Sequence, residues 1–290
     1  MNIKILSDST CDLSPALLAE HNIDLARLTT IKNGEDFIDG ETITPADIFA
    51  HVANGGDLCS TTAYNIGEYE ELFRKYASDY DAVIHINIGS GFSSCYQNAC
   101  LAAEDFPNVR VIDSQNLSTG QGHVVLEACR LAKTCNDLDE IVEKLNAFTA
   151  RLESSFLLDQ LTYMVKGGRC SSVAALGANL LGLKPCIEVK NGKLTVVKKY
   201  RGTYAKCLAS YVKERLADRE DILRNELFLT YTPVSDECRD WWSWRARALA
   251  TAQSAMAFSF ARKSWQCWGT GPSLCTRRTT CGTSPRRLQS

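Results

Sequence analysis

Short apolar segments alternate with helical segments through the first half of this chain, and this alternation constrains the fold most strongly. Ile3–Leu6, Ala82–Ile88 and Val109–Ile112 have the apolar, β-prone composition of buried strands, and helical patterns follow at 121–134 and 137–150. Parallel strands need a long crossover between them, which is usually a helix. The sequence therefore predicts an α/β fold with a parallel sheet in its N-terminal half.

Helix starts in this half can be placed from their capping residues. Ser14-Pro15 and Thr44-Pro45 each put a hydroxyl at the cap position and a proline in the first turn. Asn65 is followed three residues later by Glu68, the spacing of a capping box. We therefore expect helices to begin directly after Ser14, Thr44 and Asn65.

The second half has a different pattern. Cys186–Tyr200 is two alternating runs around Asn191-Gly192, a two-residue turn that favours a β-hairpin. A helix is expected at 203–217 and a strand at 226–232, which gives an α+β unit. We place the domain boundary near residue 153. The prediction is an N-terminal α/β domain at 1–153 and a C-terminal α+β domain at 154–240.

Residues 241–290 differ in kind from the rest of the chain. They hold all five tryptophans, seven Arg and one Lys, but no Asp, Glu, Val, Ile, Asn or His. They carry +8, against −10 for residues 1–240. A shift of one nucleotide before Trp241, with GC-rich codons assumed, restores an apolar and charged pattern suited to a helix. We interpret the segment as an aberrant, out-of-frame tail that should form no strand beside Glu226–Thr232, which leaves the C-terminal domain incomplete.

The loop Gly89–Ser94, GSGFSS, joins a strand end to a helix that runs through Ala103. Ligands of open α/β sheets bind outside the carboxyl ends of the strands, and a helix N-terminus favours anions. The hydroxyls of Ser93 and Ser94 add donors there. The loop lacks the lysine of a P-loop and the third glycine of a dinucleotide fingerprint, so a single carboxylate is the simplest anion. Ser93 taken alone is as well explained as a helix cap.

Two further polar loops are expected to reach the same crevice. Asp8–Asp12 follows the first strand, and Cys59–Ala63 precedes the helix capped by Asn65. Each one alone is an ordinary capping loop. Their convergence with Gly89–Ser94 favours a binding site.

These segments together resemble the DegV family. The matching pieces run in order along residues 1–240: DSTCDL at 8–13, STT at 60–62, SGFSSCYQNA at 90–99, VIDS at 111–114, GGR at 167–169, GLKPCIEVKNGKL at 182–194 and YRGTYAK at 200–206. The resemblance implies a two-domain DegV-like fold. Members of that family bind one fatty acid between the two domains and act as the acyl-carrying subunit of a fatty acid kinase.

The resemblance also implies a fatty-acid-binding site in this chain. Thr61 or Thr62 and Ser93 would grip the carboxylate, and Ser94 would lie beside them. No catalytic residue, cofactor or metal is implied, because a partner kinase subunit would supply the chemistry. This sequence has Ser93-Ser94-Cys95 where the family usually has serine-glycine-threonine. The histidine of the family's C-terminal loop has no counterpart in the tail.

Two arginines are implied to face the partner. Arg169 and Arg201 would lie near the carboxylate end of the fatty acid or on the kinase-docking face. On physical grounds alone they are equally well explained as surface charges or as partners of helix ends.

Composition excludes several other classes. The acidic body does not suggest nucleic acid binding. The thirteen cysteines include no CxxC and no Cys/His cluster at zinc spacing, which favours reduced thiols in a cytoplasmic protein. No signal peptide and no membrane-span pattern is found, so we expect at most transient membrane contact.

Two alternatives remain open at this point. The first is a hydrolase or transferase that uses Ser93, which would need a base within hydrogen-bond reach. None of the four histidines belongs to a recognisable triad motif, and His85 lies within a strand. The second is a regulatory interaction protein with an empty cleft.

Overall fold

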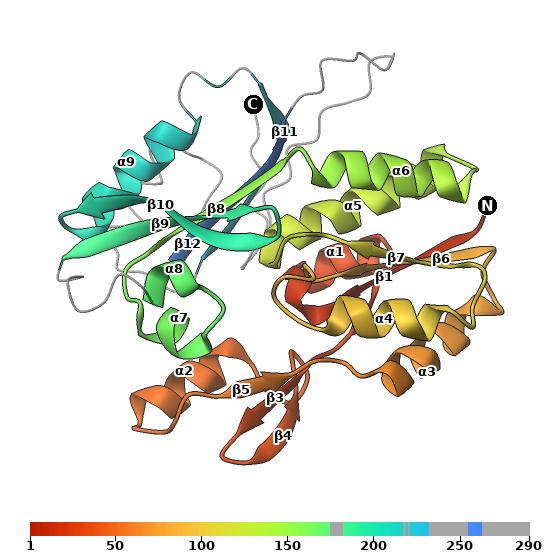
Figure 1. The fold of residues 1–290 in the computed structure, drawn as a ribbon, viewed down its shortest axis with the longest axis horizontal. Coiled ribbons are helices and arrows are strands. Elements are labelled where there is room, and N and C mark those ends of the chain that lie inside the picture. Colours follow the sequence, from red (N-terminus) through yellow and green to blue (C-terminus); the bar gives the residue numbers. More distant parts are fainter. Residues whose placement is uncertain (175–181, 217–218, 220, 232–254, 263–290) are drawn as a thin grey trace, which may run out of the picture.

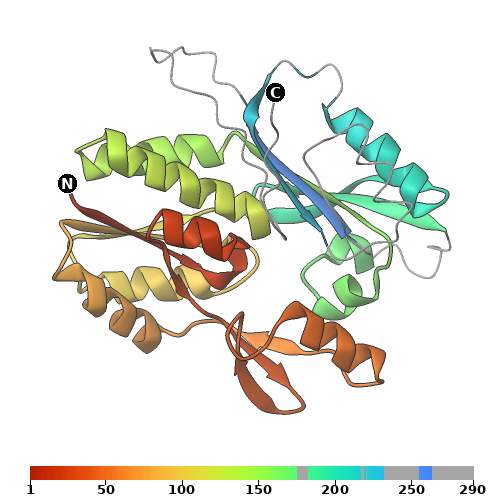
Figure 2. The same ribbon diagram turned by 180° about the vertical axis from the view of Figure 1, so that it is seen from behind.

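The computed structural model describes residues 1–174, 182–216, 219, 221–231 and 255–262, which form two units side by side (Figure 1; Figure 2). The first unit is built on a four-stranded sheet in the order β2-β1-β6-β7, with every neighbouring pair parallel. Its strands are β1 (Ile3–Asp8), β2 (Asp24–Ala26), β6 (Ala82–Asn87) and β7 (Val109–Asp113). The predicted parallel α/β sheet is therefore confirmed.

Helices cover both faces of this sheet. They are α1 (Pro15–Glu20), α3 (Ile66–Ala77), α4 (Cys95–Ala103), α5 (Ser118–Thr134) and α6 (Leu138–Thr149). Successive side chains of a strand point to opposite faces, so Ile5 packs with α1, α5 and α6 while Leu6 packs with α3 and α4. Burial on both faces explains why the strands are almost continuously apolar.

The helix starts follow the predicted caps. Ser14 accepts a hydrogen bond from the Leu17 backbone N–H, and Asn65 and Glu68 form a complete capping box. Thr44 forms a second capping box with Asp47 at the start of α2 (Pro45–Ala53). These three predictions are confirmed.

The second unit contains a five-stranded antiparallel sheet in the order β10-β9-β8-β12-β11. Its strands are β8 (Leu152–Leu158), β9 (Leu183–Lys190), β10 (Lys193–Arg201), β11 (Ile222–Tyr231) and β12 (Ala255–Arg262). The helices α7 (Thr162–Gly167), α8 (Ser171–Ala174) and α9 (Tyr204–Leu216) complete it. Asn191 and Gly192 both have positive φ, at 49° and 68°, as the predicted two-residue hairpin turn requires.

Three parts of this region were predicted incompletely. The sequence analysis placed no element at α7 or α8, and residues 175–181 after α8 lie outside the described part of the chain. The strand expected at 226–232 begins earlier, at Ile222. The boundary near residue 153 stays a prediction.

A small third sheet was missed by the sequence analysis. Strands β3 (Thr29–Lys32), β4 (Glu35–Ile38) and β5 (Ser60–Thr62) pair in the order β4-β3-β5. The segment Cys59–Ala63, interpreted as a loop, therefore contains a strand, and Thr61 pairs with Thr30. All three residues of β5 are exposed, so there was no apolar alternation to indicate a strand.

The prediction that the tail forms no strand beside Glu226–Thr232 is wrong. β12 lies between β8 and β11 and pairs with both in antiparallel register. Composition was a poor guide here because backbone groups make the ladder, and large and small residues alternate through AMAFSFAR. Residues 232–254 and 263–290 lie outside the described part, so the out-of-frame origin of the tail stays a prediction.

Substitution in β12 tests its central position. Ser259 faces Ser154 of β8 and Phe228 of β11 in the register. Proline has no N–H to give to either neighbour, so Ser259→Pro should lower the free energy of unfolding by about 2 kcal/mol or more in urea titrations. Ser259→Ala keeps the N–H and serves as the control. Equal stability of the two variants would show that β12 is not a central strand.

Candidate functional site

The two units meet at the loop that follows β6. Gly91 lies against the carbonyl oxygen of Gly192 in the β9–β10 turn, so closely that an added Cβ would collide with that oxygen. The missing side chain of Gly91 is thus what lets the two backbones approach. On another part of the seam, the ring of Phe228 in β11 lies 4.4 Å from the His123 ring of α5, centroid to centroid.

An apolar group of residues from both units lies at this meeting point, and we call it the seam cluster. Its members are Leu158, Cys170, Ile187 and Leu194, which are buried, and Phe92, Leu117, Phe156, Leu161, Met164, Val189 and Val196, which are partly buried. Phe92 and Leu117 come from the first unit, and the others come from the second. The partly buried side chains leave apolar surface that a ligand can cover.

Ser93 and Ser94 follow Phe92 at the N-terminus of α4. The Ser93 hydroxyl accepts a hydrogen bond from the Cys95 N–H at 3.3 Å and donates to the Cys95 sulfur at 3.1 Å. Ser93 is half-buried, whereas Ser94 is exposed and its side chain makes no cap bond. Ser93 therefore takes part in capping α4.

Thr61 and Thr62 are exposed on β5 and approach α4 through Tyr64. The Asn98 side chain of α4 donates to the Tyr64 carbonyl oxygen at 2.8 Å. The segment that carries both threonines is thereby tied to the first turn of α4.

A buried carboxylate lies beneath this region. The Asp8 side chain has no exposed surface and accepts hydrogen bonds from the Tyr69 hydroxyl at 2.9 Å, the Asn87 side chain at 3.2 Å and the Ile88 N–H at 2.6 Å. His85 Nε2 lies 3.3 Å from the same carboxylate. Because Ile88 begins the loop to Ser93, this network fixes where that loop leaves the sheet. From the sequence, Asp8 was expected only as part of a polar loop, and its buried hydrogen-bond network was not predicted.

Cys95 connects the network to Ser93 but is not a reactive thiol. Burial, reinforced by the charge of Asp8, raises the pKa of Cys95, and burial likewise raises the pKa of Tyr69. Both groups are therefore neutral near pH 7. Among the described residues, the Ser93 hydroxyl hydrogen-bonds with Cys95 and with no general base.

Other polar groups of the three loops are used within the protein. Ser90 donates to Asp113 at 2.6 Å, which links the loops after β6 and β7. Thr10, from η1 (Ser9–Cys11), donates to Gln121 at 2.9 Å. These contacts stabilise the loops around Ser93.

Arg169 and Arg201 lie on the surface of the second unit. Arg169 follows α7 and donates to the Gly167 carbonyl oxygen at 2.8 Å, and Arg201 ends β10. Both side chains are exposed. Their partner-facing role stays a prediction.

A family model described as an uncharacterised protein of the DegV family matches residues 2–248. The chain belongs to the DegV family. It is 30% identical over 223 residues to a DegV domain-containing protein of Clostridium acetobutylicum, which covers 76% of this chain and 80% of the relative.

Two solved structures have the same fold. A fatty acid binding DegV family protein from Thermus thermophilus superposes with a TM-score of 0.78 at 24% identity, over 91% of this chain and all of that one. A stearic acid-binding protein from Eubacterium ventriosum superposes with a TM-score of 0.73 at 24% identity. The superposition covers 90% of this chain and 98% of that protein. The expected two-domain DegV fold is therefore confirmed.

The contact at Gly91 can be tested by adding one methyl group. Gly91→Ala should destabilise the protein by about 1–3 kcal/mol in urea titrations, because the colliding atom belongs to a backbone. Gly67→Ala in α3 is the matched control, since its Cβ meets nothing closer than 3.4 Å and should not lower stability. Equal stability of the two variants would contradict the close approach of the units.

Proposed function

We propose that this protein binds a long-chain fatty acid at the seam between its two units and presents the carboxylate to a partner kinase. The observation that carries the proposal is the adjacency of Phe92 and Ser93. One loop supplies an aromatic ring to the seam cluster and, at the next residue, a hydroxyl at a helix N-terminus. An apolar site that continues directly into an anion-binding site suits an amphiphile with a small acidic head.

The seam cluster would provide most of the affinity. Each methylene of an acyl chain removed from water contributes about 0.8 kcal/mol before association costs. Seven cluster side chains are only partly buried, which leaves apolar surface on both units for the chain to cover. Enclosure between the units would also select for a long chain.

The hydroxyl groups would fix the direction of the ligand. Ser93 can turn its proton from the Cys95 sulfur to a carboxylate oxygen, a stronger acceptor, while its oxygen stays near the helix N-terminus. Thr61 and Thr62, tied to α4 through Tyr64, would bind from the other side. Cys95 has no exposed surface, so its thiol does not take the place of the family's threonine hydroxyl. Ser94, which is exposed, would lie beside the head.

The relatives support the choice of ligand. The superposed proteins from Thermus thermophilus and Eubacterium ventriosum bind a fatty acid and stearic acid, respectively. The shared fold supports the proposal that this chain binds a ligand of the same class.

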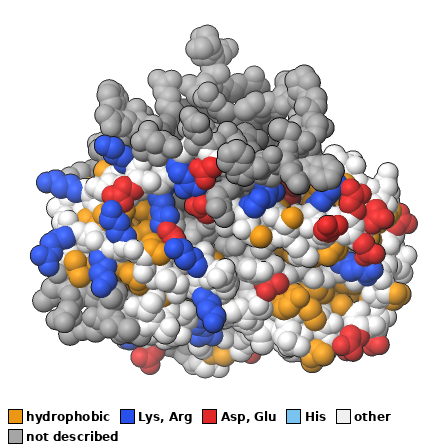
Figure 3. Space-filling model, turned by 45° about the horizontal axis from the view of Figure 1, so that its top comes forward, with side chains coloured by type: hydrophobic (Ala, Val, Ile, Leu, Met, Phe, Trp, Pro, Cys, Tyr) orange, Lys and Arg blue, Asp and Glu red, His pale blue; other side chains and the backbone are white. Residues whose placement is uncertain are grey.

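A partner kinase would supply the chemistry, because no base among the described residues hydrogen-bonds with Ser93 and the Cys95 thiol is neutral. Residues 182–216 hold nine Lys and Arg against two Glu. Figure 3 shows Lys and Arg side chains gathered over the side of the molecule that this unit forms. Arg201 is one of these nine, and Arg169 adds to the same basic surface, which suits an acidic docking face on a cytoplasmic kinase subunit. No helix among the described residues is long and apolar enough to cross a membrane.

Removal of one hydroxyl tests the carboxylate site. Ser93→Ala should weaken binding of stearate by roughly 1.5–3 kcal/mol, the range for hydrogen bonds to charged groups. Binding is measured by titration with the delipidated full-length chain, and thermal stability is followed in parallel.

Ser78→Ala, which removes a hydroxyl at the end of α3, is the control and should bind stearate like the unmodified protein. If Ser93→Ala lowers the melting temperature while stearate affinity is unchanged, Ser93 is a helix cap and the proposed head site is wrong.

A further inference from the structure

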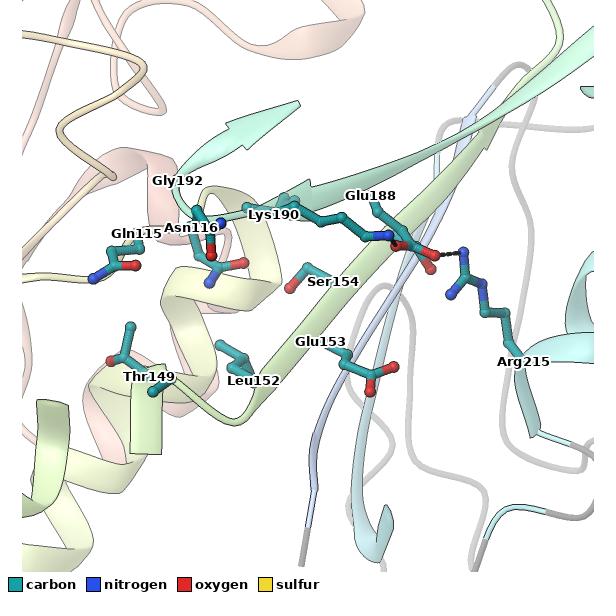
Figure 4. A pocket seen from close by; sticks show the side chains of 14 residues that line it. Gln115, Asn116, Thr149, Leu152, Glu153, Ser154, Glu188, Lys190, Gly192 and Arg215 are labelled. Atoms are coloured by element: carbon teal, nitrogen blue, oxygen red, sulfur yellow. Dashed lines mark ion pairs between the residues drawn. The ribbon is translucent and has the colours of Figure 1, made fainter. Parts of the chain in front are cut away.

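A hollow lies along the seam, lined by residues of both units (Figure 4). It encloses about 480 Å³, within the range of small-molecule sites. Gln115, Asn116 and Thr149 line it from the first unit, and Ser154, Glu188 and Gly192 are among the residues that line it from the second. None of the proposed carboxylate-binding residues lines it, although Val189 of the seam cluster does, so the pocket adjoins the proposed acyl site and lies away from its head.

Three residues that line this pocket each carry a side-chain oxygen with no hydrogen-bond partner among the described residues. These oxygens are Asn116 Oδ1, Thr149 Oγ1 and Ser154 Oγ, and all three atoms are buried. The residues Asn116 and Thr149 are only 4% and 5% exposed. Buried polar atoms nearly always have a partner, so three orphaned oxygens around one hollow point to a missing ligand.

The geometry at Gly120 keeps this space open. A Cβ there would lie 2.5 Å from Asn116 Oδ1 and would also collide with Ser154 Oγ. The two oxygens therefore lie side by side over the position of the missing side chain, and Figure 4 shows the Ser154 hydroxyl directed toward Asn116. Because Asn116 Nδ2 already donates to the Ser114 carbonyl oxygen, its Oδ1 is an acceptor that requires a donor.

The charges around the pocket are compensated. Glu188 pairs with Lys190 at 2.8 Å and also with Arg215, and Glu153 pairs with Arg219 at 3.1 Å. A charged ligand would have to break one of these ion pairs or remain uncompensated. An uncharged ligand would neither break an ion pair nor bring an uncompensated charge into the pocket.

We propose that this pocket binds a small uncharged polyhydroxyl molecule, of polyol or monosaccharide size. A ligand hydroxyl group can both donate and accept a hydrogen bond. It can therefore donate to Asn116 Oδ1, and it can either donate to or accept from the hydroxyls of Thr149 and Ser154. The ligand would touch both units at once, since its partners lie at Asn116 and Thr149 on one side and at Ser154 on the other.

The test compares two variants of the full-length chain with ribitol and glucose as probes. The double variant Thr149→Val/Ser154→Ala removes two of the three oxygens with little change of shape. Saturation-transfer NMR titrations should show saturable binding of at least one probe to the unmodified protein. Binding should be weaker by roughly tenfold or more in the double variant, as expected for the loss of two hydrogen bonds. The melting temperature without probe should not fall, because orphaned oxygens stabilise nothing.

Thr134→Val is the matched control, because Thr134 ends α5 as Thr149 ends α6. It should bind the probes like the unmodified protein. The proposal is overturned if neither probe saturates at millimolar concentration or if the double variant binds equally well. It is also overturned if the melting temperature of the double variant falls, since the oxygens would then be satisfied by structural water. Stearate affinity should be unchanged in the double variant, which separates this site from the fatty acid site.

Discussion

The approach of Gly91 to the carbonyl oxygen of Gly192 sets how the two units meet, and the neighbouring features depend on it. A side chain at residue 91 would push the β9–β10 turn away. The next residue, Phe92, then packs among apolar side chains of the second unit, and Ser93 caps α4. Three consecutive residues therefore join the units, line an apolar site and supply a polar group beside it.

The buried carboxylate of Asp8 holds the start of this loop, which runs from Ile88 to Ser93. Hydrogen bonds from Tyr69, Asn87 and the Ile88 N–H compensate a charge that burial would otherwise make very unfavourable. The Ile88 contact joins the end of β1 to the start of the loop after β6. A rigid loop loses little entropy when a ligand binds, so this network would pre-organise the head site for a carboxylate.

Much of the fold could be predicted from local patterns, whereas contacts between distant segments could not. The parallel sheet, three helix caps and the Asn191-Gly192 hairpin follow from short stretches with their own physical signals. The serine loop was proposed as a site from the same kind of local pattern, but the Asp8 network joins residues up to eighty positions apart. Strand β5 has three exposed residues and no alternation, so only its partner β3 defines it. β12 was rejected on the composition of the whole tail, although its own segment alternates large and small residues.

The central claim is that the seam holds one acyl chain, and mass spectrometry tests it most directly. The full-length chain is purified from cells without detergent, and its mass is measured under native and then denaturing conditions. The account predicts a native mass that exceeds the chain mass by one long-chain fatty acid, which organic extraction then releases at about one molecule per chain. A chain that carries no lipid, or that releases a nucleotide or a sugar phosphate in its place, would contradict the account.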